Sequence, residues 1–176
     1  MKNTFLYFAY GSNLLAARIH INNPTAIRRD IGRLKNFRLD FIRYSKQWRG
    51  ATATIVPTEN EHVWGAIWEI HNSNMAGLDV QEGVPDKAYF ADTVDIETPS
   101  GSLLKCRVYQ QCNNPKEHLV GDLLPQDRRP SAAYRETILN GAKESGLPAE
   151  YIKFLETFPH NGYTGEPNIG LPLNES

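Results

Sequence analysis

Near its start the chain reads Tyr7-Phe8-Ala9-Tyr10-Gly11-Ser12-Asn13, an apolar run that breaks into small polar residues. The run predicts a buried strand, and residues 14–21 after the break predict a short helix. Backbone N–H groups at such a corner lack partners within the helix, so they can hold an anion. Gly11 permits close backbone approach, and Ser12 and Asn13 can cap the helix or hydrogen-bond a ligand. The pattern alone is more typical of an ordinary strand-to-helix turn than of a binding loop.

The composition is typical of one globular domain. The 176 residues are 40% hydrophobic and 22% charged, which is enough apolar content for a buried core. We expect a single domain over residues 1–176, with an irregular tail from about residue 159. The 19 basic and 20 acidic side chains give a formal net charge of −1, and no long run of one sign indicates a nucleic-acid or membrane surface. The ligands are therefore expected to be small molecules.

The cysteines and histidines form no recognisable metal or redox pattern. Cys106 and Cys112 lack the spacing partners of a disulfide framework or zinc site, so we expect a core residue and a loop residue in a reduced, cytoplasmic protein. The five histidines show no short metal-ligand spacing. The corner at Gly11 lacks the lysine of a P-loop and the later glycines of a dinucleotide fingerprint. The sequence therefore predicts neither a metal nor a cofactor.

Alternation of apolar and polar residues predicts several short strands in the middle of the chain. After the opening strand, they are expected at Phe37–Phe41, Ala51–Val56, His62–Ile70, Tyr89–Ile96 and Leu103–Gln110. Pro57–Glu61 is interpreted as a turn between two of these strands, and Thr98-Pro99-Ser100-Gly101 as the connection of a hairpin. In the last strand, alternate residues from Leu104 should face the core, which puts Tyr109 on the opposite side.

Short helices surround these strands. One is expected over Ser73–Gly83, capped by its first residue and stopped by its final glycine, and two more over Ser131–Ser145 and Pro148–Phe158. This grouping favours an α+β fold with a mostly antiparallel, barrel-like sheet and flanking helices over an alternating βαβ fold. Residues Cys112–Pro130 have several prolines and little periodicity, which is typical of a lid or binding loop and also of partial disorder.

Glu82 is the ionisable residue whose position suggests chemistry. It falls at the end of a predicted helix, just before Gly83, so it faces the negative end of the helix dipole. That position disfavours the ionised carboxylate and raises the pKa, which suits a group that accepts and returns a proton. Position alone is still more typical of a solvated carboxylate. Asp79, about one turn earlier, is the rival candidate, although it could equally cap or solvate the helix.

The opening loop and the region of Glu82 together resemble one family, the γ-glutamylcyclotransferases, which release pyroglutamate from γ-glutamyl amino acids. The matching segments follow the family's order across nearly the whole chain: Phe5–Leu14 with Arg18-Ile19-His20, Val63-Trp64-Gly65, Leu78-Asp79 with Gln81-Glu82-Gly83-Val84, Gly141-Ala142-Lys143-Glu144 with Gly146-Leu147-Pro148, Glu150-Tyr151 and Tyr163-Thr164-Gly165. The chain departs from the family pattern at Tyr44–Gly50, which is shorter, at Cys112–Pro130, which is longer, and at the C-terminus. These differences concern the pocket rim and the leaving group rather than the reaction.

The resemblance implies a barrel-like fold of about six strands, a loop over Tyr7–Ser12 that holds the glutamyl group, and Glu82 as the catalytic acid/base. It implies a substrate contact for Tyr134, positions near the pocket for Tyr89 and Tyr109, no cofactor and a homodimer. The candidate substrate-binding residues are therefore Tyr7, Phe8, Ala9, Tyr10, Gly11, Ser12, Asn13, Tyr89, Tyr109 and Tyr134.

Two alternatives remain beside a cyclotransferase for γ-glutamyl amino acids or dipeptides. The first is a related enzyme that acts on γ-glutamyl amines or on glutathione; Asn13 and the residues around Glu82 favour the amino acid substrates. The second is a non-catalytic γ-glutamyl-binding protein, in which the acid would be lost or blocked. Glu82 is present in the sequence.

Overall fold

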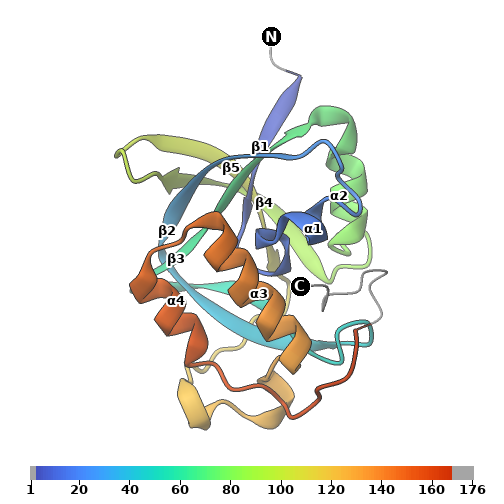
Figure 1. Cartoon of the computed structure of the whole chain (residues 1–176), viewed down its shortest axis with the longest axis vertical. Coiled ribbons are helices and arrows are strands. Elements are labelled where there is room, and N and C mark those ends of the chain that lie inside the picture. Colours follow the sequence, from blue (N-terminus) through green and yellow to red (C-terminus); the bar gives the residue numbers. More distant parts are fainter. Residues whose placement is uncertain (1–2, 168–176) are drawn as a thin grey trace.

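The computed structural model describes residues 3–167. Figure 1 shows its helices and strands, which do not alternate regularly along the chain. The elements are β1 (Thr4–Ala9), η1 (Ser12–Leu14), α1 (Ala16–Ile19), β2 (Ile27–Ser45), β3 (Gly50–His71), η2 (Asn72–Asn74), α2 (Met75–Gln81), β4 (Tyr89–Glu97), β5 (Leu103–Gln111), η3 (Gly121–Leu123), η4 (Gln126–Arg128), α3 (Ala132–Ser145) and α4 (Ala149–Glu156), where η marks a 3₁₀ helix.

The strands form a closed barrel in the order β1-β3-β2-β4-β5, and β5 returns to β1. Four of the neighbouring pairs are antiparallel, whereas β1 and β5 run parallel and meet at Tyr7 and Arg107. The predicted α+β fold with a mostly antiparallel, barrel-like sheet is thus confirmed. The closing pair brings β1 and β5 together. It thereby brings Tyr109 close to the opening corner, which is the turn at Gly11-Ser12-Asn13.

The barrel has five strands rather than about six, because the two strands predicted on either side of Pro57–Glu61 are one. β3 runs through this segment without reversing. Lys35 pairs with His62 and Phe37 with Pro57, so β3 accommodates its extra residues in an irregularity of the ladder. Asn36 and Asn60 both adopt positive φ there, of 65° and 66°. Asparagine tolerates this conformation, and the two residues are linked by an N–H to side-chain hydrogen bond of 3.2 Å.

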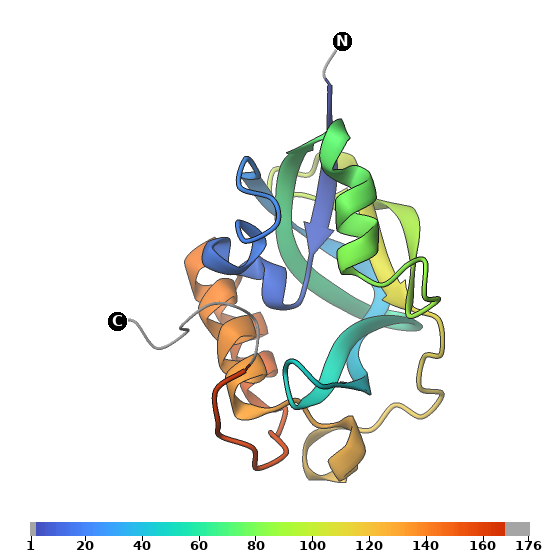
Figure 2. The same cartoon turned by 90° about the vertical axis from the view of Figure 1, so that its right-hand side faces the viewer.

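Helices cover the barrel on two sides, with α2 on one side and α3 on the other (Figure 2). β1 is buried on both faces over Tyr7–Ala9, which explains why its sequence is a continuous apolar run. α3 packs tightly on the opening corner, since a Cβ on Gly141 would lie 2.6 Å from the Cβ of Leu14. The corner that follows β1 is therefore held from outside by a helix near the other end of the chain.

The predicted boundaries of α3 are confirmed, whereas α1, α2 and α4 are each shorter than predicted. α3 is capped by Ser131, whose hydroxyl accepts the N–H of Tyr134 at 3.2 Å. Gly83 has φ +74° and lies directly after the helical turn that ends α2, as a C-terminal stop requires. The prediction of Ser73 as an N-cap is wrong. Its backbone N–H instead donates to His71, because the chain enters a 3₁₀ turn before α2 begins.

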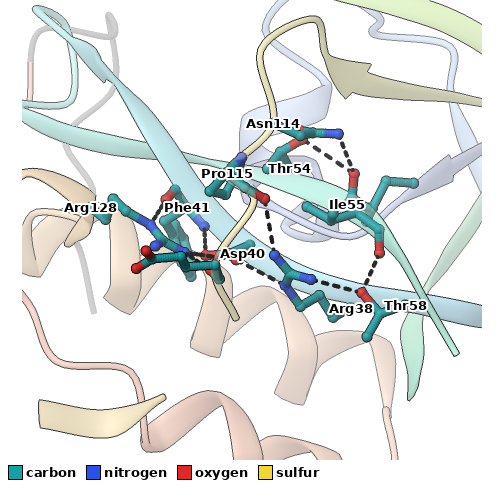
Figure 3. A network of polar contacts seen from close by, with 11 residues as sticks. Arg38, Asp40, Phe41, Thr54, Ile55, Thr58, Asn114, Pro115 and Arg128 are labelled. Carbon is teal, nitrogen blue, oxygen red and sulfur yellow. Dashed lines mark hydrogen bonds and ion pairs between the residues drawn. The ribbon is translucent and has the colours of Figure 1, made fainter. Parts of the chain in front are cut away.

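The segment 112–130 contains the two short turns η3 and η4 and is tied to β2 by buried charges (Figure 3). Asp40 on β2 accepts from Arg128 at 2.8 and 2.9 Å and from Arg38 at 3.0 Å. Arg38 also donates to the carbonyl of Pro115 at 3.1 Å. The expectation of a lid receives no support, because the segment is fixed against the barrel.

Residues 159–167 contain no helix or strand, in line with the expected irregular tail, and the remainder of that tail lies outside the described residues. Cys106 is buried in β5 and Cys112 is exposed just after it, as predicted. Burial raises the pKa of the Cys106 thiol to about 12, so the thiol stays protonated. Within residues 3–167, no helix combines the length and the apolar character needed to cross a membrane.

Candidate active site

A small pocket opens beside the corner at the end of β1. Hydroxyl groups, backbone and one carboxylate line it, contributed by β1, the corner after it, β3, the residue after α2, β4, β5 and α3. The lining residues are Tyr7, Tyr10, Gly11, Ser12, Asn13, Ala53, Glu82, Tyr89, Tyr109 and Tyr134. Phe8 and Ala9 are not among them. Phe8 points to the other face of β1, where its ring lies 2.7 Å from the position that a Cβ on Gly65 would take.

Glu82 lies where α2 ends, with its N–H donating to the carbonyl of Leu78 at 3.0 Å. Its side chain is directed at the opening corner, where Asn13 Nδ2 lies 3.5 Å from Oε1 and the hydroxyl of Tyr7 hydrogen-bonds the carboxyl group. Tyr7 lies in β1 and Asn13 in the corner that follows this strand. The carboxylate of Glu82 therefore links the end of α2 to the opening corner.

The ionisation of Glu82 is strongly perturbed. Burial raises the pKa of its carboxyl group from 4.5 to about 7. The positive charge of Arg18 and the hydrogen bond from Tyr7 oppose the rise, and the negative charge of Asp79 adds slightly to it. A carboxyl group with this pKa can both take and return a proton near neutral pH. The shift was expected from the helix dipole, but burial is its main cause.

The hydroxyl protons of four pocket tyrosines are already committed to partners. Tyr7 accepts from Asn13 at 3.2 Å and bonds Glu82, and Tyr10 donates to the carbonyl of Tyr109 at 2.5 Å. The hydroxyl of Tyr89 donates to the carbonyl of Ala53 at 2.8 Å. Tyr109 bonds the carboxylate of Asp79 and accepts from the guanidinium of Arg107 at 3.0 Å. These four hydroxyls hold the walls of the pocket in place.

Tyr134 is different. Its hydroxyl oxygen accepts the N–H of Ala53 at 2.9 Å, which leaves the hydroxyl proton free to donate. The same oxygen lies 3.5 Å from the position of a Cβ on Gly11 and so faces the opening corner. Burial raises the pKa of Tyr134 well above its usual value, so the proton is retained at any physiological pH. Tyr134 is therefore a neutral donor directed at the pocket.

The opening corner adds further unsatisfied groups. The N–H groups of Leu14 and Leu15 close the 3₁₀ turn by donating to Gly11 and Ser12 at 3.1 and 3.2 Å. The N–H groups of Ser12 and Asn13 donate to no acceptor within residues 3–167. The Oδ1 atom of Asn13 is buried and also has no partner among those residues. The pocket thus offers backbone donors on one side and an uncharged acceptor beside Glu82.

Three features of the site carried no signal in the sequence. Ala53 supplies backbone N–H and C=O groups to two tyrosines, and a backbone role is not visible in residue type. Asp79 forms a bidentate ion pair with Arg107, at 2.8 Å for each oxygen, and so positions Tyr109. Only the barrel closure brings α2 and β5 into contact. Tyr109 was expected opposite the core, but α2 covers that face and buries it.

Comparisons with known proteins identify one family. The chain matches the AIG2-like family over residues 62–155. It is 41% identical over 167 residues to gamma-glutamylcyclotransferase of Bos taurus, which covers 93% of this chain and 83% of the bovine protein. The Homo sapiens protein of that name is 40% identical over 169 residues, covering 94% and 84%. A solved structure of a gamma-glutamyl cyclotransferase superposes with a TM-score of 0.84 at 39% identity, covering 93% of each chain.

The similarity covers more than nine tenths of the chain rather than a single motif. The fold agrees with that of the solved relative along almost its whole length. The chain belongs to the γ-glutamylcyclotransferase family.

Proposed function

We propose that this protein cyclises γ-glutamyl amino acids or dipeptides, releasing 5-oxoproline and a free amino acid, with Glu82 as the general acid/base. The observation that carries the proposal is the half-buried carboxyl group of Glu82, with a pKa of about 7, directed at a corner of unsatisfied backbone and amide groups. Named relatives at about 40% identity support the type of reaction.

The reaction joins two groups of one molecule. The α-amine nitrogen attacks the γ-carbonyl carbon, a new C–N bond closes the five-membered ring, and the bond to the departing amine breaks. Holding the substrate folded back on itself makes this step intramolecular, for which effective molarities on the order of 10⁵ M or more are known. A pocket whose tyrosine walls are held by hydrogen bonds suits this task.

Glu82 handles the protons of both halves of the reaction. The substrate α-ammonium has an ordinary pKa of about 8, so it can give a proton to a carboxylate whose conjugate acid has a pKa of about 7. The same proton then passes from Glu82 to the nitrogen of the departing amine. The unpartnered Oδ1 of Asn13 beside Glu82 would accept a hydrogen bond from the α-amine and hold it in place.

The developing negative charge on the γ-carbonyl oxygen requires a donor. The free hydroxyl proton of Tyr134 and the N–H groups of Ser12 and Asn13 are candidates, and those left over would bind the substrate α-carboxylate. Tyr7, Tyr10, Tyr89 and Tyr109 would shape the pocket around the glutamyl group. Phe8 and Ala9 would act only as the buried strand that positions the corner.

The remaining expectations belong to the same proposal. We propose one domain over residues 1–176, a place in glutathione and γ-glutamyl metabolism in the cytoplasm, and a homodimer. These rest on the family resemblance and on the composition of the chain. Light scattering of the purified protein would test the dimer, which predicts twice the chain mass of 19.9 kDa.

Release of 5-oxoproline from a substrate panel tests the reaction itself. The panel contains γ-glutamyl-alanine, γ-glutamyl-cysteine, a γ-glutamyl amine and glutathione. The proposal predicts turnover of the γ-glutamyl amino acids. Turnover of the amine or of glutathione alone would favour the alternative enzyme, and binding without any 5-oxoproline would favour a non-catalytic binding protein.

A further inference from the structure

Arg18 on α1 is a charged side chain that the reaction described above does not use. Its guanidinium lies 5.8 Å from the centre of the Trp48 ring, and its Nε atom is buried without a partner within residues 3–167. Each of the other buried or half-buried arginines of the described chain bonds a carboxylate or a carbonyl oxygen; they are Arg28, Arg33, Arg38, Arg107, Arg128, Arg129 and Arg135. Arg18 bonds neither.

Arg28 makes the hydrogen bonds that Arg18 lacks, although its Nε atom is also buried without a partner within residues 3–167. It also stacks on a tryptophan, with its guanidinium 4.5 Å from the Trp68 ring. However, its Nη2 donates to the carbonyl of Leu14 at 2.9 Å and to Glu144 at 2.5 Å. Stacking on an aromatic ring therefore leaves the edge of the guanidinium available for an anion, and in Arg28 an anion occupies it. The edge of Arg18 has none.

Arg18 lies beside the pocket, behind the residues that line it. Trp48, on which it stacks, lies 4.8 Å from the ring of Tyr134, which lines the pocket. The charge of Arg18 also acts on Glu82 and Tyr7 inside. Trp48 belongs to the turn between β2 and β3, which is the stretch 44–50 where the sequence departs from the family pattern. Arg18 therefore places a positive charge beside the pocket, stacked on a buried tryptophan that contacts the pocket residue Tyr134.

We infer that Arg18 binds the carboxylate of the departing amino acid and so selects γ-glutamyl amino acids over γ-glutamyl amines. The inference rests on the proposed function. With the α-amine at Glu82 and the glutamyl group at the corner, we place the departing residue on the side of the γ-carbonyl that faces Arg18. Its carboxylate is the anion that a free, planar guanidinium recognises with two parallel hydrogen bonds. The unpaired edge of Arg18 supplies those donors.

The test compares γ-glutamyl-alanine with γ-glutamyl-alaninamide, which replaces only the carboxylate. We expect Arg18→Gln to lower the ratio of their kcat/KM values by about ten- to hundredfold, the range for a hydrogen-bonded charge pair. Arg18→Lys, which keeps the charge without the planar fork, should lower it less. Arg28→Gln is the matched control and should leave the ratio unchanged.

Arg18 also lowers the pKa of Glu82, so the rates are compared at least about two pH units above 7, where Glu82 is ionised. Equal losses for both substrates in the Arg18 variants would overturn the inference. If the amide reacts too slowly to follow, Arg18→Gln must bring γ-glutamyl-alanine down toward the same level, and unchanged turnover would overturn it. Failure of the unaltered protein to release 5-oxoproline from either substrate would instead contradict the proposed function.

Discussion

Glu82 illustrates how far one residue can be interpreted before its surroundings are known. The sequence places it at a helix end before Gly83, and the structure has it there. The sequence cannot supply the burial that raises its pKa to about 7, because the groups around it come from β1, the opening corner and α3. The acid could be located from local pattern, whereas its chemistry depends on long-range packing.

The same pKa predicts how stability depends on pH. The folded protein retains the Glu82 proton up to about pH 7, whereas the unfolded chain loses it near 4.5, so this group makes the folded state less stable as pH rises through that window. Glu82→Gln removes the buried charge. We expect the variant to exceed the unaltered protein in unfolding free energy by about 1–3 kcal/mol at pH 8 and to match it near pH 4.5.

Denaturant unfolding at both pH values provides the measurement. Glu136→Gln, which changes an exposed carboxylate of α3, is the control. An advantage of Glu82→Gln that is the same at both pH values would mean that the carboxylate carries no burial cost.

The hydroxyl protons of the pocket predict different roles for two tyrosines. Tyr134 has a free proton to donate, whereas Tyr89 has already given its proton to Ala53. We expect Tyr134→Phe to lower kcat by about ten- to hundredfold, and Tyr89→Phe to lower it much less. Steady-state kinetics with γ-glutamyl-alanine measures both. Equal losses of kcat would show that the free proton has no part in the reaction.

Between elements, the contact of α2 with β5 depends on one ion pair. Asp79 bonds Arg107 with both oxygens and also holds the hydroxyl of Tyr109. Asp79→Asn should lower the unfolding free energy by about 1–3 kcal/mol and leave kcat within a few-fold of normal. Because the charge of Asp79 raises the pKa of Glu82, the acidic limb of the kcat/KM profile should move to lower pH.

Thermal unfolding and the pH profile of this variant check the two effects separately. Arg107→Met breaks the same ion pair and keeps the Asp79 charge, so it should destabilise the protein without moving the limb to lower pH. Complete loss of turnover in Asp79→Asn, with the fold intact, would make Asp79 the catalytic group.

The helices near the end of the chain were the easiest elements to predict. Ser131 caps the start of α3 and Gly146 ends it, and each of these signals depends only on nearby residues. α3 lies between them as expected. The long strands were not predictable in the same way. β2 and β3 continue through Asn36 and Asn60 because each strand supports the other, and a single chain segment carries no sign of that pairing.

At the scale of the molecule, the segment 112–130 depends on the buried cluster of Asp40, Arg38 and Arg128. Replacing the carboxylate by Asp40→Asn leaves two buried guanidinium groups without their anion, so we expect a loss of about 3–5 kcal/mol in unfolding free energy. Asp127→Asn, at an exposed position of the same segment, should cost little. Denaturant unfolding of both variants measures the difference.

Kinetics of the same variants tests whether the segment 112–130 contributes to substrate binding. None of its residues lines the pocket, so the KM of Asp40→Asn should stay normal at temperatures where the variant is folded. A raised KM in a stable variant would make the segment part of the site after all. The sequence was compatible with a lid here, because its charged residues resemble those of a solvated loop. Their ion pairs with β2 form only when the chain folds.

The whole account depends on Glu82 moving a proton during ring closure. The most direct measurement is 5-oxoproline release from γ-glutamyl-alanine by the unaltered protein and by Glu82→Gln, with calorimetric binding of the substrate to both. We predict release by the unaltered protein, and in the variant a fall in turnover of at least about a thousandfold, with binding retained. Near-normal turnover by Glu82→Gln would contradict the central claim.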